Sequence, residues 1–118
     1  MTKRGPGAGK LLKRVIWQAP TAVPNGMGGT FQGWEDRTFA CHAAMMYLRG
    51  GETVQAARLE GRQPVVVTIR ACSDAAAIRE NWRMVDEDTG ILYNVRLPPV
   101  LTDDRAFYEI TAESGVPT

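Results

Sequence analysis

The sequence contains few of the residues from which enzymes build catalytic and metal sites. Its 118 residues include one histidine, His42, and two cysteines, Cys41 and Cys72. One histidine and two distant cysteines are too few donors for a typical zinc site, and two cysteines make no disulfide framework. Cys41 adjoins His42, but adjacent residues of a strand point to opposite faces, so their side chains should diverge. We therefore expect no catalytic residues, no metal and no cofactor.

A long apolar run and a strong net charge are also missing. No run approaches the roughly 20 residues needed to span a bilayer, so we expect no membrane contact. A formal net charge of +1 gives no strong field that would attract the whole protein to nucleic acid. The start of the chain is basic and glycine-rich rather than apolar, so we expect no export signal and folding in a reducing cytosol. There, both cysteines should behave as small buried hydrophobes.

The charges are unevenly placed along the chain. Five Lys and Arg residues precede the first acidic residue, Glu35, whereas residues 103–113 hold four acidic residues and one Arg. Unlike charge at the two ends would let copies of the chain pair head to tail, although solvated tails are the commoner outcome. The charge pattern alone leaves both outcomes open.

Length and composition favour one globular domain. The chain is 44% hydrophobic and 23% charged, which are ordinary values for a folded protein, and domains most often have about 100–150 residues. Residues 1–10 have the Gly and Pro content of a flexible tail and are basic. We divide the chain into this tail and a single β domain over residues 11–118.

Most of the β domain has the pattern of strands. Strands are predicted over residues 12–18, 34–49, 64–72, 81–85, 91–97 and 106–112. Helix competes in the second segment, which is rich in Ala and Met, but its neighbours favour a strand. Residues 86–90 join two strands as a hairpin, with Gly90 suited to a left-handed turn position. These segments predict a mainly β fold, a small β-barrel or sandwich of five to six strands with one short helix or loop insertion.

A glycine-rich segment, residues 20–33, separates the first two predicted strands. Two prolines, Asn25-Gly26 and Gly28-Gly29 argue against regular structure there, and long loops in small domains are usually functional or disordered. Trp17 and Trp34 flank the segment and could pack its base onto the core. We interpret it as a long functional loop.

A second unusual segment lies between two glycine sites. Residues 52–59 have a helical composition and are bracketed by Gly50-Gly51 and Gly61. Eight residues are marginal as a helix without tertiary contacts. We predict that this segment becomes ordered only when a partner binds.

Several motifs follow one another in a specific order. They are Trp17-Gln-Ala-Pro20, the glycine-rich loop, Gly33-Trp34, the run from Gly51 to Arg70 (GETVQAARLEGRQPVVVTIR), Asn81-Trp-Arg83, Thr89 to Arg96 (TGILYNVR) and Glu113 to Val116 (ESGV). Each motif alone is only a strand signature, and their order and spacing are the specific part. In this respect the chain resembles the head-closure proteins of tailed phages, also called head–tail joining, adaptor or stopper proteins. The likeness covers nearly the whole chain beyond the basic tail.

The resemblance implies a structural role in the virion. It implies a ring of copies of the chain, expected to be a dodecamer, that lies below the portal, extends the DNA channel, retains packaged genome and offers a docking surface for the tail. The expected partners are other copies, the portal or adaptor protein above, tail proteins below and double-stranded DNA. The expected location is the head–tail neck, with assembly in the host cytoplasm.

The resemblance also suggests which residues do this work. A long loop of such proteins projects toward the channel, and residues 49–62 match it here. The candidate DNA-facing residues are Arg49, Gly50, Gly51, Arg58, Gly61 and Arg62, because arginines in a channel would hold DNA through sequence-independent charge contacts. The same arginines would otherwise only solvate a surface helix. The candidate contacts to an adjacent ring are Asn25, Gly26, Met27, Gly28 and Gly29.

Two other functions fit the sequence. The first is a tail-completion or tail-terminator protein, because these motifs distinguish it poorly from a head-closure protein. A small barrel that binds nucleic acid as a monomer is the alternative outside virion proteins, because small barrels stack bases on aromatic residues. Against it, no predicted strand carries a basic face.

Overall fold

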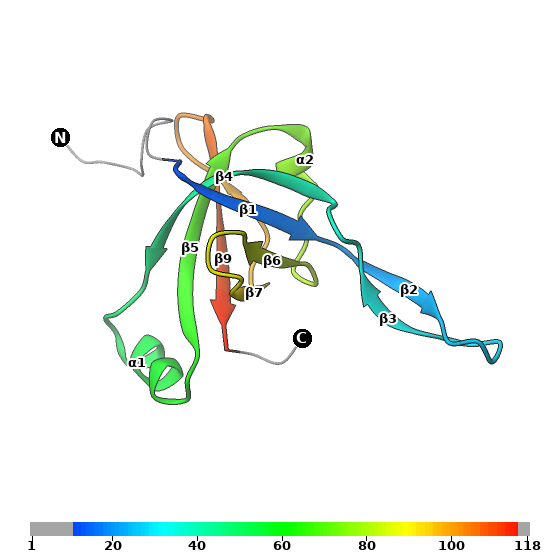
Figure 1. The fold of residues 1–118 in the computed structure, drawn as a ribbon. Coiled ribbons are helices and arrows are strands. Elements are labelled where there is room, and N and C mark those ends of the chain that lie inside the picture. The colour runs from blue at the N-terminus through cyan, green and yellow to red at the C-terminus, as the bar shows by residue number, and fades with distance from the viewer. Residues whose placement is uncertain (1–10, 116–118) are drawn as a thin grey trace.

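The computed structural model describes residues 11–115, so the predicted tail, residues 1–10, lies outside the described residues. Nine strands and two helices follow in the order shown in Figure 1. They are β1 (Lys13–Gln18), β2 (Pro20–Pro24), β3 (Thr30–Trp34), β4 (Phe39–Tyr47), α1 (Glu52–Leu59), β5 (Gln63–Arg70), α2 (Ser73–Ala76), β6 (Arg83–Asp86), β7 (Leu92–Val95), β8 (Val100–Leu101) and β9 (Phe107–Ser114). Neither helix is long and apolar enough to cross a membrane.

Six antiparallel strands close into a β-barrel. They pair in the order β5-β4-β1-β6-β7-β9, and β9 pairs back with β5 from Gln63↔Ser114 to Arg70↔Phe107. The short strand β8 pairs antiparallel with β9 through Val100↔Glu109 and Leu101↔Tyr108. All six barrel strands fall within the segments predicted as strands or overlap them, so the predicted mainly β fold is confirmed as a barrel.

Strand alternation fills the inside of the barrel. Inward-facing residues are fully or almost fully buried, and they include Val15 and Trp17 of β1, Val67 and Ile69 of β5, and Ile110 of β9. Alternate residues of the same strands, such as Arg14, lie outside. The strand predicted over residues 12–18 is therefore confirmed, and its two faces differ in burial as strand geometry requires.

Helix α2 was not predicted from the sequence. It is only four residues long, and the Cys72 sulfur accepts a hydrogen bond from the Ala75 N–H at 3.4 Å at its start. Ala75 and the following Ile78 are fully buried in the core cluster. This short helix thus contributes to the core. Four residues are too few to show a helical period in the sequence, so it was not detected there.

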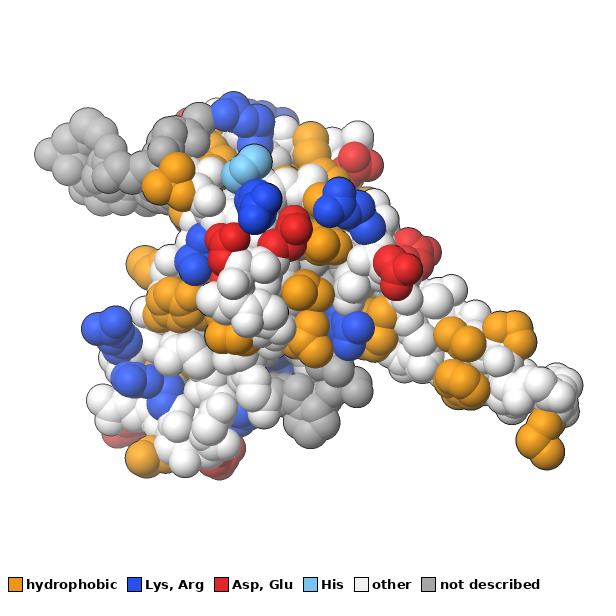
Figure 2. Space-filling view, in the orientation of Figure 1, with side chains coloured by type: hydrophobic (Ala, Val, Ile, Leu, Met, Phe, Trp, Pro, Cys, Tyr) orange, Lys and Arg blue, Asp and Glu red, His pale blue; other side chains and the backbone are white. Residues whose placement is uncertain are grey.

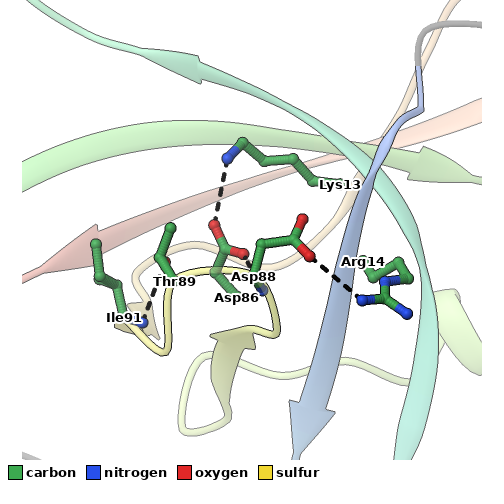
Figure 3. A network of polar contacts seen from close by, with 6 residues as sticks. All are labelled: Lys13, Arg14, Asp86, Asp88, Thr89 and Ile91. Carbon is green, nitrogen blue, oxygen red and sulfur yellow. Dashed lines mark hydrogen bonds and ion pairs between the residues drawn. The ribbon is translucent and has the colours of Figure 1, made fainter.

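A polar cluster joins β1 to the β6–β7 turn (Figure 3). The Lys13 ammonium lies 3.4 Å from the buried Asp86 carboxylate, whose other oxygen accepts the Asp88 N–H at 2.9 Å. Arg14 pairs with Asp88 at 3.4 Å on the surface. Partial burial lowers the pKa of Lys13, but Asp86 and Tyr47 raise it by more. The β1–β4 ladder ends at the pair Lys13↔Ala43. The cluster therefore fixes the first residues of β1 at the end of this ladder.

The interpretation of residues 20–33 as a segment without regular structure was wrong. Strands β2 and β3 form a two-stranded antiparallel hairpin that projects from the barrel (Figure 1). Hydrogen bonds from Glu35 N to Ala19 O and from Asn25 N to Gly29 O bracket the ladder. By antiparallel alternation, Pro20 and Pro24 then fall in non-bonded pairs, so their missing N–H groups cost the hairpin no hydrogen bond.

Stability should depend on the barrel and not on the hairpin. We predict that Ile110→Ala lowers the free energy of unfolding by about 2–5 kcal/mol, because it leaves a cavity in the closed core. Met27→Ala, at the hairpin tip and 89% exposed, should change it by less than about 0.5 kcal/mol. Urea denaturation followed by Trp fluorescence measures both. A similar loss from the two substitutions would contradict this division.

Candidate assembly surfaces

The β2–β3 hairpin, residues 20–34, is here called the arm. No Asp, Glu, Lys, Arg or His occurs between Val15 and Trp34. Along the arm, Figure 2 accordingly shows only hydrophobic and uncharged side chains. The arm extends a molecule whose Cα radius of gyration is 15.3 Å, against about 13 Å for a compact chain of this size. An uncharged projection of this kind suits contact with protein and not with phosphate.

The tip of the arm consists of the five residues predicted as an interface loop, Asn25 to Gly29. The Asn25 side chain accepts hydrogen bonds from Met27 N at 2.8 Å and from Gly29 N at 3.2 Å. Gly26 and Gly28 have φ values of 80° and 85°. All five residues are exposed. The structure thus places these residues together at the far end of the arm, while their role in an interface stays a prediction.

Apolar side chains continue along the arm behind the tip. Val23 pairs with Phe31 across the two strands, and Phe31 is 57% exposed. Gly33 leaves room for Val23, because a Cβ atom at Gly33 would lie 2.3 Å from Val23 Cγ2. A two-stranded hairpin is at best marginally stable by itself in water. The arm therefore depends on its base or on a partner for order.

The base of the arm is fixed to the barrel by hydrogen bonds and a ring contact. Arg83 lies over the Trp34 ring at 4.5 Å and donates to the Gln18 side-chain oxygen at 2.6 Å. Gln18 in turn donates to the Asp36 carbonyl at 3.0 Å, and Thr38 accepts from Ala19 N at 2.9 Å. Burial lowers the pKa of Arg83 from its ordinary value. These contacts set the direction in which the arm leaves the barrel.

The second projecting segment, residues 49–62, contains helix α1. Gly51 precedes the helix with φ 86° and no side-chain cap, and only Ala57 of the helix is buried. At the other end Gly61, φ 84°, allows Arg62 N to bond Ala57 O and Gly61 N to bond Arg58 O. This paired arrangement is a Schellman C-cap. The predicted helix over residues 52–59 is confirmed, and its predicted ordering on partner binding stays a prediction.

The three arginines of this segment have different surroundings. Arg62 pairs with Glu60 and lies 3.3 Å from the mostly buried Glu113 carboxylate, and these partners raise its pKa. Its charge is therefore satisfied locally, and it ties the segment to β9. Arg49 and Arg58 are exposed and have no ion pair within residues 11–115. Only these two remain available as DNA contacts.

Sequence reasoning missed a row of two arginines and a histidine across three strands. Arg14 of β1 is opposite His42 of β4, and the pairing of Ala43 with Ile69 places Arg70 of β5 beside His42. All three side chains are exposed. No single strand shows this pattern, because it arises only from the register of three strands. Arg14 is partly neutralised by Asp88.

The cysteines and the histidine form no site for a metal. Within residues 11–115, no group of three or more His, Cys, Asp or Glu residues could hold a metal ion. Cys41 and Cys72 line one pocket of about 410 Å³ with His42 and Arg70 on its wall. Cys41 is half-buried, and burial raises its pKa to about 11. Cys72 is exposed, so the prediction of two buried cysteines was wrong for Cys72, which sits at the start of α2 and not inside β5.

Comparisons with known proteins identify the family from a family model and the fold from solved structures. A family model described as phage head completion protein matches residues 7–115. The solution structure of protein SF1141 from Shigella flexneri 2a has a TM-score of 0.68 and 19% sequence identity, over 96% of this chain and 100% of that one. A chain in the virion of a native gene transfer agent particle has a TM-score of 0.56 and 18% identity, over 88% of this chain and 94% of that one. No curated protein matches the sequence.

We predict that Gly33→Val distorts the arm and leaves the barrel folded. The new side chain would overlap Val23, which is β-branched and has little freedom to move. Amide hydrogen exchange should become faster over residues 20–34 and stay unchanged over β5 and β9. Gln32→Val is the matched control, because Gln32 is exposed in the same strand. Equal exchange in the two variants would show that the close contact has no structural role.

The two thiols should differ in reactivity toward a thiol reagent. At pH 8 the exposed Cys72 should react quickly, whereas Cys41, with a pKa of about 11, should hold roughly a hundredfold less thiolate than an ordinary thiol. Because the folded state favours the protonated Cys41 thiol, this residue contributes to the free energy of unfolding. The contribution is fully present below about pH 9 and is lost as the pH rises toward about 11. Reaction kinetics of the wild type and of Cys72→Ser measure this. A fast phase that survives Cys72→Ser would contradict the assignment.

Proposed function

The chain belongs to the phage head completion protein family, and we propose that it is a structural protein of the head–tail neck that forms a ring below the portal. The ring closes the portal channel after DNA packaging, retains the DNA and offers a docking surface to the tail. Its partners are further copies of the chain, a portal or adaptor protein, tail proteins and packaged double-stranded DNA. A dodecamer is the expected ring. The chain has no catalytic role in this function.

One observation carries the proposal: a closed barrel bears two projecting segments of opposite character. The arm has no charged residue over its whole length, and residues 49–62 carry two exposed arginines without ion-pair partners in the described part of the chain. In Figure 1 the arm and α1 leave the barrel in different directions. A neck component needs both kinds of surface, one for neighbouring proteins and one for DNA.

The segment with α1 is suited to a channel. It has few buried residues and glycines at both ends, and an ion pair, Arg62–Glu113, ties its second end to β9. Arg49 and Arg58 can then approach the phosphate backbone of any sequence, since phosphate contacts need only charge and reach. A ring repeats these contacts in every copy, so weak single contacts would add up around the DNA.

The structure gives little support to the two other functions. A monomeric nucleic-acid-binding barrel needs exposed aromatic platforms, but Trp17 and Tyr93 are buried, and Phe39, Trp82 and Tyr108 pack against the core. Phe31, on the arm, and Tyr47, at the end of β4, are the exposed aromatics of residues 11–115. A tail-completion or tail-terminator protein would act on the tail side. The family description, head completion, supports the head side instead.

Removing the two exposed arginines should weaken DNA retention and leave folding unchanged. We predict that filled particles with the Arg49→Gln, Arg58→Gln chain release DNA at lower salt than wild-type particles, because each copy loses about two phosphate contacts. DNase-sensitive DNA, measured over a salt series, reports the release.

The Arg70→Gln, Arg96→Gln chain is the matched control, since it also loses two exposed charges but from barrel strands and their ends. It should retain DNA as the wild type does. If both double variants release DNA alike, only total charge matters. If neither does, residues 49–62 do not hold the DNA.

A further inference from the structure

We infer that the outer edge of β3 binds an extended strand of a different neck protein, which pairs with it through backbone hydrogen bonds. The outer edge is the side of β3 that faces away from β2. This inference rests on the proposed ring and names one partner contact of the arm. The partner strand is uncharged and carries apolar side chains on one face.

The pairing register of the arm determines which of its backbone groups are free. The two hydrogen bonds that bracket the ladder fix which pairs are bonded. Bonded and non-bonded pairs alternate in an antiparallel ladder, so the even-numbered residues of β2 and β3 form the non-bonded pairs. The N–H and C=O groups of Thr30, Gln32 and Trp34 therefore point away from β2. Within residues 11–115, β3 has no second strand beside it.

Proline closes the opposite edge of the arm. β2 presents Pro20, Ala22 and Pro24 at its own outer edge, and proline has no backbone N–H. Two of the three donors that an added strand would need are therefore missing there. Proline on an edge strand is one of the devices by which proteins prevent strand addition. The arm is closed to a further strand at β2 and open to one at β3.

The strand β3 has none of the features that usually protect an exposed edge. It contains no proline and no charged residue, and Thr30, Phe31 and Gln32 are exposed. It also projects from the barrel, where another protein can reach it (Figure 1). A hairpin of two strands is marginally stable, whereas three strands with an apolar face can be stable. A strand added beside β3 therefore stabilises the arm as it binds.

The side chains of the arm indicate the chemistry of the added strand. Val23 and Phe31 are directly paired and share one face of the hairpin, whereas Thr30 and Gln32 lie on the other. A shallow hollow of about 350 Å³, lined by residues 20–22 and 30–32, offers space for a side chain of the partner. The arm has no charge that could pair with a charged strand. An uncharged strand with apolar residues at alternate positions fits this edge best.

The described strands of another copy do not fit the β3 edge. Each of the six barrel strands already has a neighbour on both sides, and β8 has only two residues and directly follows Pro98-Pro99. Pairing of β3 with β3 would join two copies through the same surface, across a two-fold axis, and would stop there. A ring instead needs two different surfaces on each copy. A different protein is therefore the source of the strand.

Proline placed on each edge in turn tests this inference. Gln32 and Ala22 face each other in one non-bonded pair. Gln32→Pro therefore removes an outward N–H from β3, and the matched control, Ala22→Pro, removes one from β2. Both leave the ladder bonds inside the arm intact. Hydrogen exchange of the purified chains checks this, because the Val23 and Phe31 amides should exchange as in the wild type.

The readout is the infectious titre of particles assembled with each full-length variant. Gln32→Pro should lower the titre by about tenfold or more, because a backbone bond is lost in every copy of the ring. Ala22→Pro should give the wild-type titre. A wild-type titre with Gln32→Pro, or an equal loss with both variants, would overturn the inference.

A photo-crosslinking residue in place of Thr30 identifies the partner without using proline. In assembled particles its links should fall on one extended, uncharged segment of a different virion protein. The same residue in place of Ala22 should give fewer links to that segment. Links from position 30 only to other copies, or no links although the chain is in the particle, would overturn the inference and leave the proposed neck function intact. Absence of the chain from particles would remove both.

Discussion

Closure of the barrel between β5 and β9 is the constraint on which the rest of the structure depends. Eight residues of each strand pair along their whole length, so the sheet has no long open edge and its interior is filled by its own side chains. Within the arm and residues 49–62, only Ala57 is consequently buried by the rest of the chain. Any further surface that these two projections bury must be covered by another molecule. A small barrel with two such projections therefore suits assembly with partners better than independent binding.

Electrostatics divides the surface in the same way. On the barrel, the carboxylates of Asp86, Asp88 and Glu113 pair with Lys13, Arg14 and Arg62. The arm has no charge to pair. Arg49 and Arg58 lie together in one projecting segment, without an ion-pair partner among residues 11–115. The charge of residues 49–62 therefore supports the proposed contact with DNA, and the uncharged arm supports the proposed contact with protein.

Much of the barrel could be predicted from the sequence because alternation is a local signal. Val15 and Trp17 alternate with Arg14, Ile16 and Gln18, and this pattern shows the inward face of β1 without knowledge of any partner strand. The arm was mistaken for a loop because of its two prolines. They leave the hairpin hydrogen bonds intact only in one pairing register, and the sequence of a single strand does not show its register. Helix α2 was missed because four residues show no period. The row of Arg14, His42 and Arg70 and the Arg62–Glu113 pair both join distant segments, so only the fold reveals them.

A reconstruction of the neck in assembled particles by electron microscopy tests the central claim most directly. Our account predicts a ring in which the uncharged arms contact neighbouring proteins and residues 49–62 face the central channel. A ring with arms free of any protein contact and with Arg49 and Arg58 on its outer surface would contradict it.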